Sequence, residues 1–102
     1  MAKLFGTDGV RGEVNQVLTP DLAYRIGAVF THLLKETSSR PKIIIGRDTR
    51  LSGPMLTGAV AAGISAHGGD VYDLGIIPTP AVSALVREEK ADAGIVISAS
   101  HN

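Results

Sequence analysis

The sequence has no cysteine, only four aromatic residues and no net charge. The lack of cysteine excludes disulfides, thiolate metal sites and cysteine nucleophiles, and it fits a reducing compartment. Ten basic and ten acidic residues cancel, so there is no electrostatic footprint for nucleic acid. No apolar run approaches the roughly 20 residues of a membrane span, and the N-terminus lacks the apolar core of a signal peptide. We therefore expect a soluble, cytoplasmic protein with neither a nucleic-acid nor a membrane partner.

What is present indicates one small folded unit. The chain has 102 residues, 44% of them hydrophobic and 20% charged, with 12 glycines. This composition is typical of a soluble α/β protein rather than of a disordered tail, and the length corresponds to about one domain.

Helix and strand signals alternate along the chain. Thr19 and Pro20 supply a cap and a first helical residue, and Thr79 with Pro80 repeats the pattern. Gly63 is expected to let the middle helix pack closely on the sheet. Strands are predicted at 42–46, 71–74 and 93–97, with a shorter one at 3–5. The fold class predicted is a three-layer α/β/α domain with a mainly parallel or mixed sheet.

The parallel strands would place their carboxyl ends on one edge of the sheet. Ligands bind at that edge in open α/β sheets, and the helices that start there favour anions such as phosphate. No G-x-G-x-x-G, G-x-x-x-x-G-K-[ST] or G-x-S-x-G pattern occurs in the sequence. A dinucleotide-binding fold, a P-loop and a hydrolase elbow are therefore disfavoured.

Polar residues follow the last predicted strand. Ser100, His101 and Asn102 come where a rigid β-branched strand should end, a position suited to a nucleophile or a phosphate carrier. The alternative is an ordinary loop or helix cap, since these side chains bond readily to local backbone. These residues alone do not decide between a reactive loop and an ordinary loop or helix cap.

A second polar segment follows the first predicted strand. Asp8 and Gly9 are a strong hairpin signal, which accounts for the glycines there. It does not account for Thr7 and Arg11, which would sit on a tight backbone where an anion could approach. A plain hairpin and an anion site both stay open.

Four segments together resemble one family, the α-D-phosphohexomutases. They are Phe5–Gly12 (FGTDGVRG), Gly46–Gly53 (GRDTRLSG), Pro78–Pro80 (PTP) and Ile97–Asn102 (ISASHN). The first and last most resemble bacterial members that interconvert glucosamine 6-phosphate and glucosamine 1-phosphate on the way to cell-wall UDP-N-acetylglucosamine. The resemblance runs the length of the chain and implies that residues 1–102 form an incomplete copy of the family's first domain, with the later domains absent.

The resemblance also implies roles for single residues. Ser100 matches the family's phosphoserine, and His101 a neighbour that assists proton or charge handling. Thr7 and Arg11 match a first loop that lines the active centre. Mg²⁺ would be bound through the phosphate on Ser100 and by aspartates beyond this chain. Arg47, Asp48 and Arg50 are expected mainly to brace the loops.

Three alternatives remain at this stage. One is a phosphomannomutase or phosphoglucomutase of the same family, because the loop that reads the sugar lies outside the chain. The others are a non-catalytic sugar-phosphate-binding module and a dimerisation domain. We expect a phosphorylated hexosamine as substrate and self-association as a homodimer, and we expect the 102-residue chain alone to be inactive.

Overall fold

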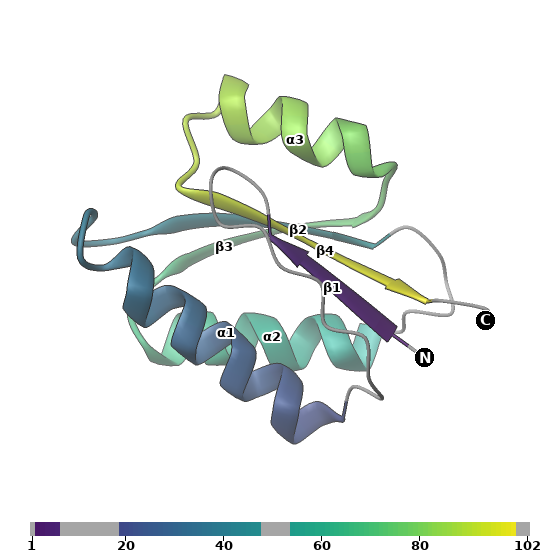
Figure 1. The fold of residues 1–102 in the computed structure, drawn as a ribbon, viewed down its shortest axis with the longest axis horizontal. Coiled ribbons are helices and arrows are strands. Elements are labelled where there is room, and N and C mark those ends of the chain that lie inside the picture. Colours follow the sequence, from purple (N-terminus) through teal and green to yellow (C-terminus); the bar gives the residue numbers. More distant parts are fainter. Residues whose placement is uncertain (1, 7–18, 48–53, 100–102) are drawn as a thin grey trace.

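The computed structural model describes residues 2–6, 19–47 and 54–99. The elements follow the predicted alternation (Figure 1). They are β1 (Ala2–Gly6), α1 (Pro20–Leu34), β2 (Lys42–Arg47), α2 (Pro54–Ala66), β3 (Asp70–Ile76), α3 (Thr79–Glu88) and β4 (Ala93–Ala99). None of the described helices combines the length and the apolar character needed to cross a membrane.

The described strands form one mixed sheet in the order β1-β4-β2-β3. β2 is parallel to both β3 and β4, with Ile45 opposite Asp73 on one side and Ile95 on the other. β1 is antiparallel to β4 and pairs Ala2 with Ala99. The predicted parallel neighbours are therefore confirmed, and β1 makes the sheet mixed.

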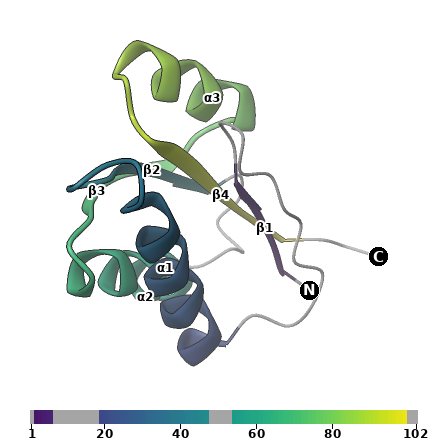
Figure 2. The same cartoon turned by 60° about the vertical axis from the view of Figure 1, so that its left-hand side comes forward.

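The sheet is the middle of three layers. α1 and α2 cover one face and α3 covers the other, as both views show (Figures 1 and 2). Successive side chains of a strand point to opposite faces, and the two apolar clusters follow this alternation. The α1/α2 side contains Ile43, Ile45, Ile95 and Ile97 with Val60 and Ile64, and the α3 side contains Ile44 and Val96 with Val82 and Val86.

Helix α1 packs against α2 at two glycines. A Cβ atom on Gly27 would run into the carbonyl oxygen of Val60, and one on Gly63 into that of Tyr24. The close packing predicted for Gly63 is therefore made with α1 and not with the sheet. The sheet is reached from this side by the larger residues of the helices, such as Val60 and Ile64.

One predicted helix start is confirmed and one is shifted. The Thr19 hydroxyl oxygen accepts a hydrogen bond from the Leu22 backbone N–H at 3.2 Å, as expected of an N-cap. In α3 the cap position belongs to Pro78, with Thr79 as the first helical residue, so the prediction of Thr79 as the cap is wrong. The reason is that the Pro78 carbonyl already accepts from Ala81, at 2.9 Å, and so opens the helix.

Strand β3 lies at the edge of the sheet and is covered on one face. Tyr72, Leu74 and Ile76 are exposed, because α3 lies over β2 and β4 rather than over β3. On the other face, Val71 packs against the α1/α2 cluster. This half-covered edge differs from β2, whose four central residues are buried.

Candidate functional site at the carboxyl edge of the sheet

The carboxyl ends of the three parallel strands lie together, as the sequence predicts. Arg47, the last residue of β2, is in register with Ile97 of β4 on one side and with Ile76 of β3 on the other. Ligands of open α/β sheets bind at this edge. It is therefore the place to look for the chemistry that the polar segments imply.

Strand β4 is held firmly at this edge. It is hydrogen-bonded to β1 on one side and to β2 on the other, and Ile95, Val96 and Ile97 are fully or almost fully buried. Ala99 ends the strand, and Ser100 is the next residue of the chain. The pairing on both sides therefore fixes the backbone at the end of β4, to which the next segment of the chain is attached.

The end of β2 is packed as tightly. A Cβ atom on Gly46 would come within 2.7 Å of the Val82 side chain and 3.1 Å of Ile77. The Ile77 backbone N–H donates to the carbonyl oxygen of Arg47 at 2.8 Å. Only glycine fits where α3 and the turn before it press on β2, and this packing fixes the backbone from which the Arg47 side chain extends.

The four residues predicted to act in the site lie outside the described residues. These are Thr7, Arg11, Ser100 and His101. The structure gives only the strand ends to which their segments are attached. Because β1 and β4 are antiparallel, Gly6 is paired with Ile95, whereas Ala99 is paired with Ala2. The two strand ends thus lie at opposite ends of the β1–β4 pair, and a shared site of the two segments stays a prediction.

Arg47 is a polar residue of this edge that the structure does describe. Its Nε atom is buried and has no hydrogen-bond partner. Sequence reasoning gave Arg47 only a bracing role, together with Asp48 and Arg50, which lie outside the described residues. Nothing local in the sequence shows that one nitrogen of an arginine will be buried and unpaired, because burial depends on the strands and helices around it.

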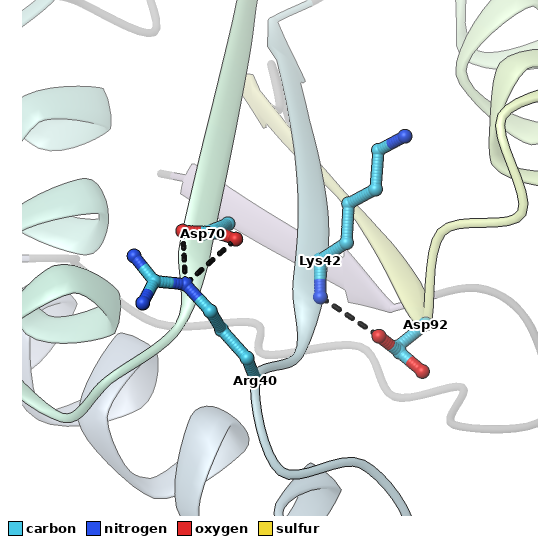
Figure 3. Close-up of polar contacts among 4 residues, drawn as sticks. All are labelled: Arg40, Lys42, Asp70 and Asp92. Carbon is cyan, nitrogen blue, oxygen red and sulfur yellow. Dashed lines mark hydrogen bonds and ion pairs between the residues drawn. The ribbon is translucent and has the colours of Figure 1, made fainter.

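At the opposite, amino edge of the sheet, the carboxylates of Asp70 and Asp92 accept hydrogen bonds from Arg40 and Lys42 (Figure 3). The Arg40 Nε–H group donates to both carboxylate oxygens of Asp70 at 2.9 Å. The Lys42 backbone N–H donates to Asp92 at 2.8 Å. The Lys42 ammonium group donates to the Glu89 carbonyl oxygen at 3.0 Å. These contacts tie the starts of β2, β3 and β4 to their neighbours.

Two surface grooves lie away from the carboxyl edge. One, of about 320 Å³, runs along the outer side of α1 between Leu22 and Leu33. The other, of about 180 Å³, lies between α3 and β3 and is lined by residues such as Ile44, Tyr72 and Leu85. Neither is lined by Arg47 or Ile97, so neither is an extension of the candidate site.

The described residues do not form a metal site by themselves. Among residues 2–6, 19–47 and 54–99, no three or more His, Asp or Glu side chains gather where they could hold a metal ion. A metal at the carboxyl edge would therefore need at least part of its ligand set from residues beyond the described ranges.

Comparison with known proteins assigns the family. Residues 2–102 match the family model described as phosphoglucomutase/phosphomannomutase, alpha/beta/alpha domain I. Curated relatives cover the whole chain: a phosphoglucosamine mutase of Alkaliphilus metalliredigens is 56% identical, and one of Desulforamulus reducens is 57% identical. The chain spans 23% of the length of each of these relatives.

A solved structure resembles the fold. It is a phosphoglucomutase/phosphomannomutase family protein from Burkholderia thailandensis, with a TM-score of 0.59 and 38% sequence identity. The match covers 76% of this chain and 16% of that one. Together with the family model, this likeness shows that the chain belongs to the phosphoglucomutase/phosphomannomutase family and corresponds to its alpha/beta/alpha domain I.

Proposed function

We propose that this chain is the phosphoserine-bearing domain of a phosphoglucosamine mutase. The observation that carries the proposal is where β4 ends. This strand is paired on both sides, its central residues are buried, and it ends at Ala99, at the edge of the sheet where ligands of α/β folds bind. Ser100 is the next residue in the sequence.

In this proposal Ser100 is the phosphate carrier. Its phosphoryl group passes to a free hydroxyl of the sugar monophosphate, so that the serine Oγ–P bond breaks and a sugar bisphosphate forms. The bisphosphate turns over, and its other phosphoryl group returns to Ser100. The net result is an isomerised sugar phosphate and an unchanged enzyme. A hydroxyl on a fixed strand end suits this exchange because positioning is the main contribution that proteins make to phosphoryl transfer.

The other expected residues have supporting roles. His101 lies beside Ser100 in the sequence and would assist proton or charge handling. Thr7 and Arg11 would help to line the site and hold the substrate phosphate. Mg²⁺, held through the phosphate of Ser100 and by residues beyond this chain, would supply charge neutralisation at the phosphoryl group.

The sugar is proposed from the relatives. Those at 56% and 57% identity are named phosphoglucosamine mutase, which favours interconversion of glucosamine 6-phosphate and glucosamine 1-phosphate in the supply of UDP-N-acetylglucosamine. The second candidate is a phosphomannomutase or phosphoglucomutase, since the family model carries both of those names.

Activity would require the longer protein. The chain covers less than a quarter of its curated relatives, so we expect no turnover by the 102-residue chain alone. We place the protein in the cytoplasm, where phosphorylated sugars are made, and we expect it to form a homodimer.

The experiment is peptide mass spectrometry of the full-length protein from its source cells. We expect the wild-type protein to carry phosphate on Ser100 and to turn over glucosamine 6-phosphate. The variant Ser100→Ala should lose both the phosphate and the turnover. The matched control is Ser98→Ala, two residues earlier and within β4, which should keep both the phosphate and the turnover. Full-length protein without phosphate and without turnover would favour a non-catalytic sugar-phosphate-binding or dimerisation domain. Turnover of mannose or glucose phosphate in preference to glucosamine phosphate would favour the second candidate.

A further inference from the structure

Helix α1 carries apolar residues on two sides. The residues of one side are buried, and they include Gly27, which contacts α2 beside it (Figure 1). The apolar residues of the other side line the groove of about 320 Å³: Leu22, Ile26, Val29, Phe30 and Leu33. A helix on the surface of a globular domain needs only one apolar stripe, the one that faces the core. The second stripe therefore indicates a further neighbour on this side of α1.

The second stripe is open to solvent along its outer part. Leu22, Ile26 and Phe30 reach the core cluster with part of their surface. Val29 and Leu33 do not belong to that cluster and are 59% and 54% exposed. Single exposed apolar side chains are common, whereas a contiguous apolar groove marks an interaction site. The groove therefore fits an apolar surface of a partner.

The spacing of the stripe indicates the shape of this partner. Leu22, Ile26, Val29 and Leu33 follow one another at intervals of four, three and four residues. This is the repeat by which one α-helix packs along another. From Leu22 to Leu33 the stripe extends over roughly 16 Å of helix. One helix laid along α1 would cover it.

Arg25 adds a requirement for charge. It is the one charged residue among those that line the groove. It is exposed, and no described residue forms an ion pair or a side-chain hydrogen bond with it. A helix docked beside Arg25 would remove its guanidinium group from water, which is unfavourable unless an acceptor replaces the water. A carboxylate matches the guanidinium best, so the docked helix should carry an Asp or Glu next to its apolar stripe.

A second copy of α1 does not meet this requirement. Asp21 is the only acidic residue of α1. If two copies of α1 paired antiparallel, with Leu22 opposite Leu33, Phe30 and not Asp21 would lie level with Arg25. A stable dimer also buries about 800 Å² per partner, more than five side chains supply when the most exposed of them is 59% exposed. The longer protein is a better source, since the chain spans only 23% of the length of its curated relatives.

We propose that the groove on α1 is the docking site for an amphipathic helix from the remaining part of the longer protein, with a carboxylate of that helix paired to Arg25. The docked helix buries Val29 and Leu33 and gives α1 a helical neighbour on each side. This inference goes beyond the proposed function, because it concerns how the domain is joined to the rest of the protein. It does not depend on Ser100 or on the reaction.

The first test measures burial of the groove in the full-length protein. Residues 1–102 contain no cysteine, so Val29→Cys introduces one thiol whose labelling by a maleimide is followed by peptide mass spectrometry. We expect labelling at least about ten-fold slower in the native protein than in urea, and the same for Leu33→Cys. The matched control is Ala62→Cys, at an exposed position of α2 outside the groove, which should label equally fast in both. Val29→Cys and Leu33→Cys thiols that react as fast in the native protein as in urea overturn the inference.

The second test identifies the partner of Arg25. Arg25→Lys places an amine at this position, and a carbodiimide couples an amine to a carboxylate that contacts it. We expect a cross-link from residue 25 to an Asp or Glu beyond residue 102 of the same molecule, at the mass of one copy. Arg25→Gln lacks the amine and should give no such link. A cross-link that joins two copies, or protection of Val29→Cys that is lost on dilution, assigns the groove to a second copy and overturns the inference. Protection without any cross-link overturns the paired carboxylate.

Discussion

The two ends of the sheet handle charge in different ways. At the amino edge, Arg40 lies against Asp70 and the Lys42 backbone against Asp92, all at 2.8–2.9 Å. At the carboxyl edge, Arg47 has a buried Nε atom without a partner. The strands between the two edges are the same three, so the difference lies in the residues at the two ends of these strands.

The comparison shows where this domain uses its polar groups for structure and where it leaves them available. Polar groups that are hydrogen-bonded to one another stabilise the fold and leave no donor or acceptor for a ligand. A buried donor without an acceptor destabilises the protein until something binds to it. A buried donor without an acceptor at one edge of the sheet is therefore better evidence for a binding site than the number of polar residues in a loop.

The largest effect is expected from the core that joins the two edges. Ile95 is 1% exposed and lies in the middle of the sheet, opposite Ile45. Ile95→Ala should lower the free energy of unfolding by about 2–5 kcal/mol, measured by urea denaturation, because it leaves a cavity. Ile95→Val is the matched control and should lower it by about 1 kcal/mol. Equal losses for the two variants would mean that the site collapses around the missing atoms.

The next largest effect is expected at the amino edge of the sheet. Asp92→Ala would leave the part-buried Lys42 N–H, now bonded at 2.8 Å, without an acceptor and should lower the free energy of unfolding by about 1–3 kcal/mol. Asp92→Asn keeps an acceptor oxygen and should have a smaller effect. In the full-length protein, turnover per folded molecule should be unchanged by either. A loss of turnover at constant stability would show that the amino edge also serves the reaction.

A smaller effect is expected from the Lys42 side chain. Its ammonium group lies 4.9 Å from the centre of the Tyr72 ring and donates to the Glu89 carbonyl oxygen at 3.0 Å. Lys42→Met keeps the apolar stem but removes the charge and should lower the free energy of unfolding by about 1 kcal/mol. Tyr72→Leu should remove most of the cation–π contribution to stability. In that background, Lys42→Met should lower the free energy of unfolding by less than it does in the wild-type protein. Additive losses would argue against a direct contact between the ring and the cation.

The smallest effect is expected for the most exposed pair. Arg40 and Asp70 have side chains 75% and 39% exposed, and exposed pairs contribute about 0–1 kcal/mol. Arg40→Gln should therefore lower the free energy of unfolding by less than about 1 kcal/mol in dilute buffer, and by nothing measurable at high salt. A loss of several kcal/mol that persists in salt would mean that the pair is part of a larger network.

Much of the fold was predictable because its signals are local. The apolar run at 42–46 and the Thr19–Pro20 pair predict the strand and helix that the structure contains at those positions. The contact of Gly63 with α1 and the uncovered face of β3 were not predictable, since both depend on how whole helices lie on the sheet.

The residues of the candidate site also differ in whether the sequence alone could predict them. Ser100, His101, Thr7 and Arg11 came from motifs in the sequence, and their placement remains a prediction. The buried Nε atom of Arg47, which has no hydrogen-bond partner, was found from the structure alone. A motif identifies residue types in a known order, whereas an unsatisfied atom can be recognised only when its surroundings are known.

The place of β4 in the sheet also has a consequence for biosynthesis. Among the described strands β4 comes latest in the sequence, yet it lies between β1 and β2. β1 is synthesised before the other described strands and, within the described part of the chain, has only β4 as a strand partner, with Ala2 opposite Ala99. Such long-range pairing is slow to form. We therefore expect the described part of the nascent sheet to stay open until β4 has left the exit tunnel.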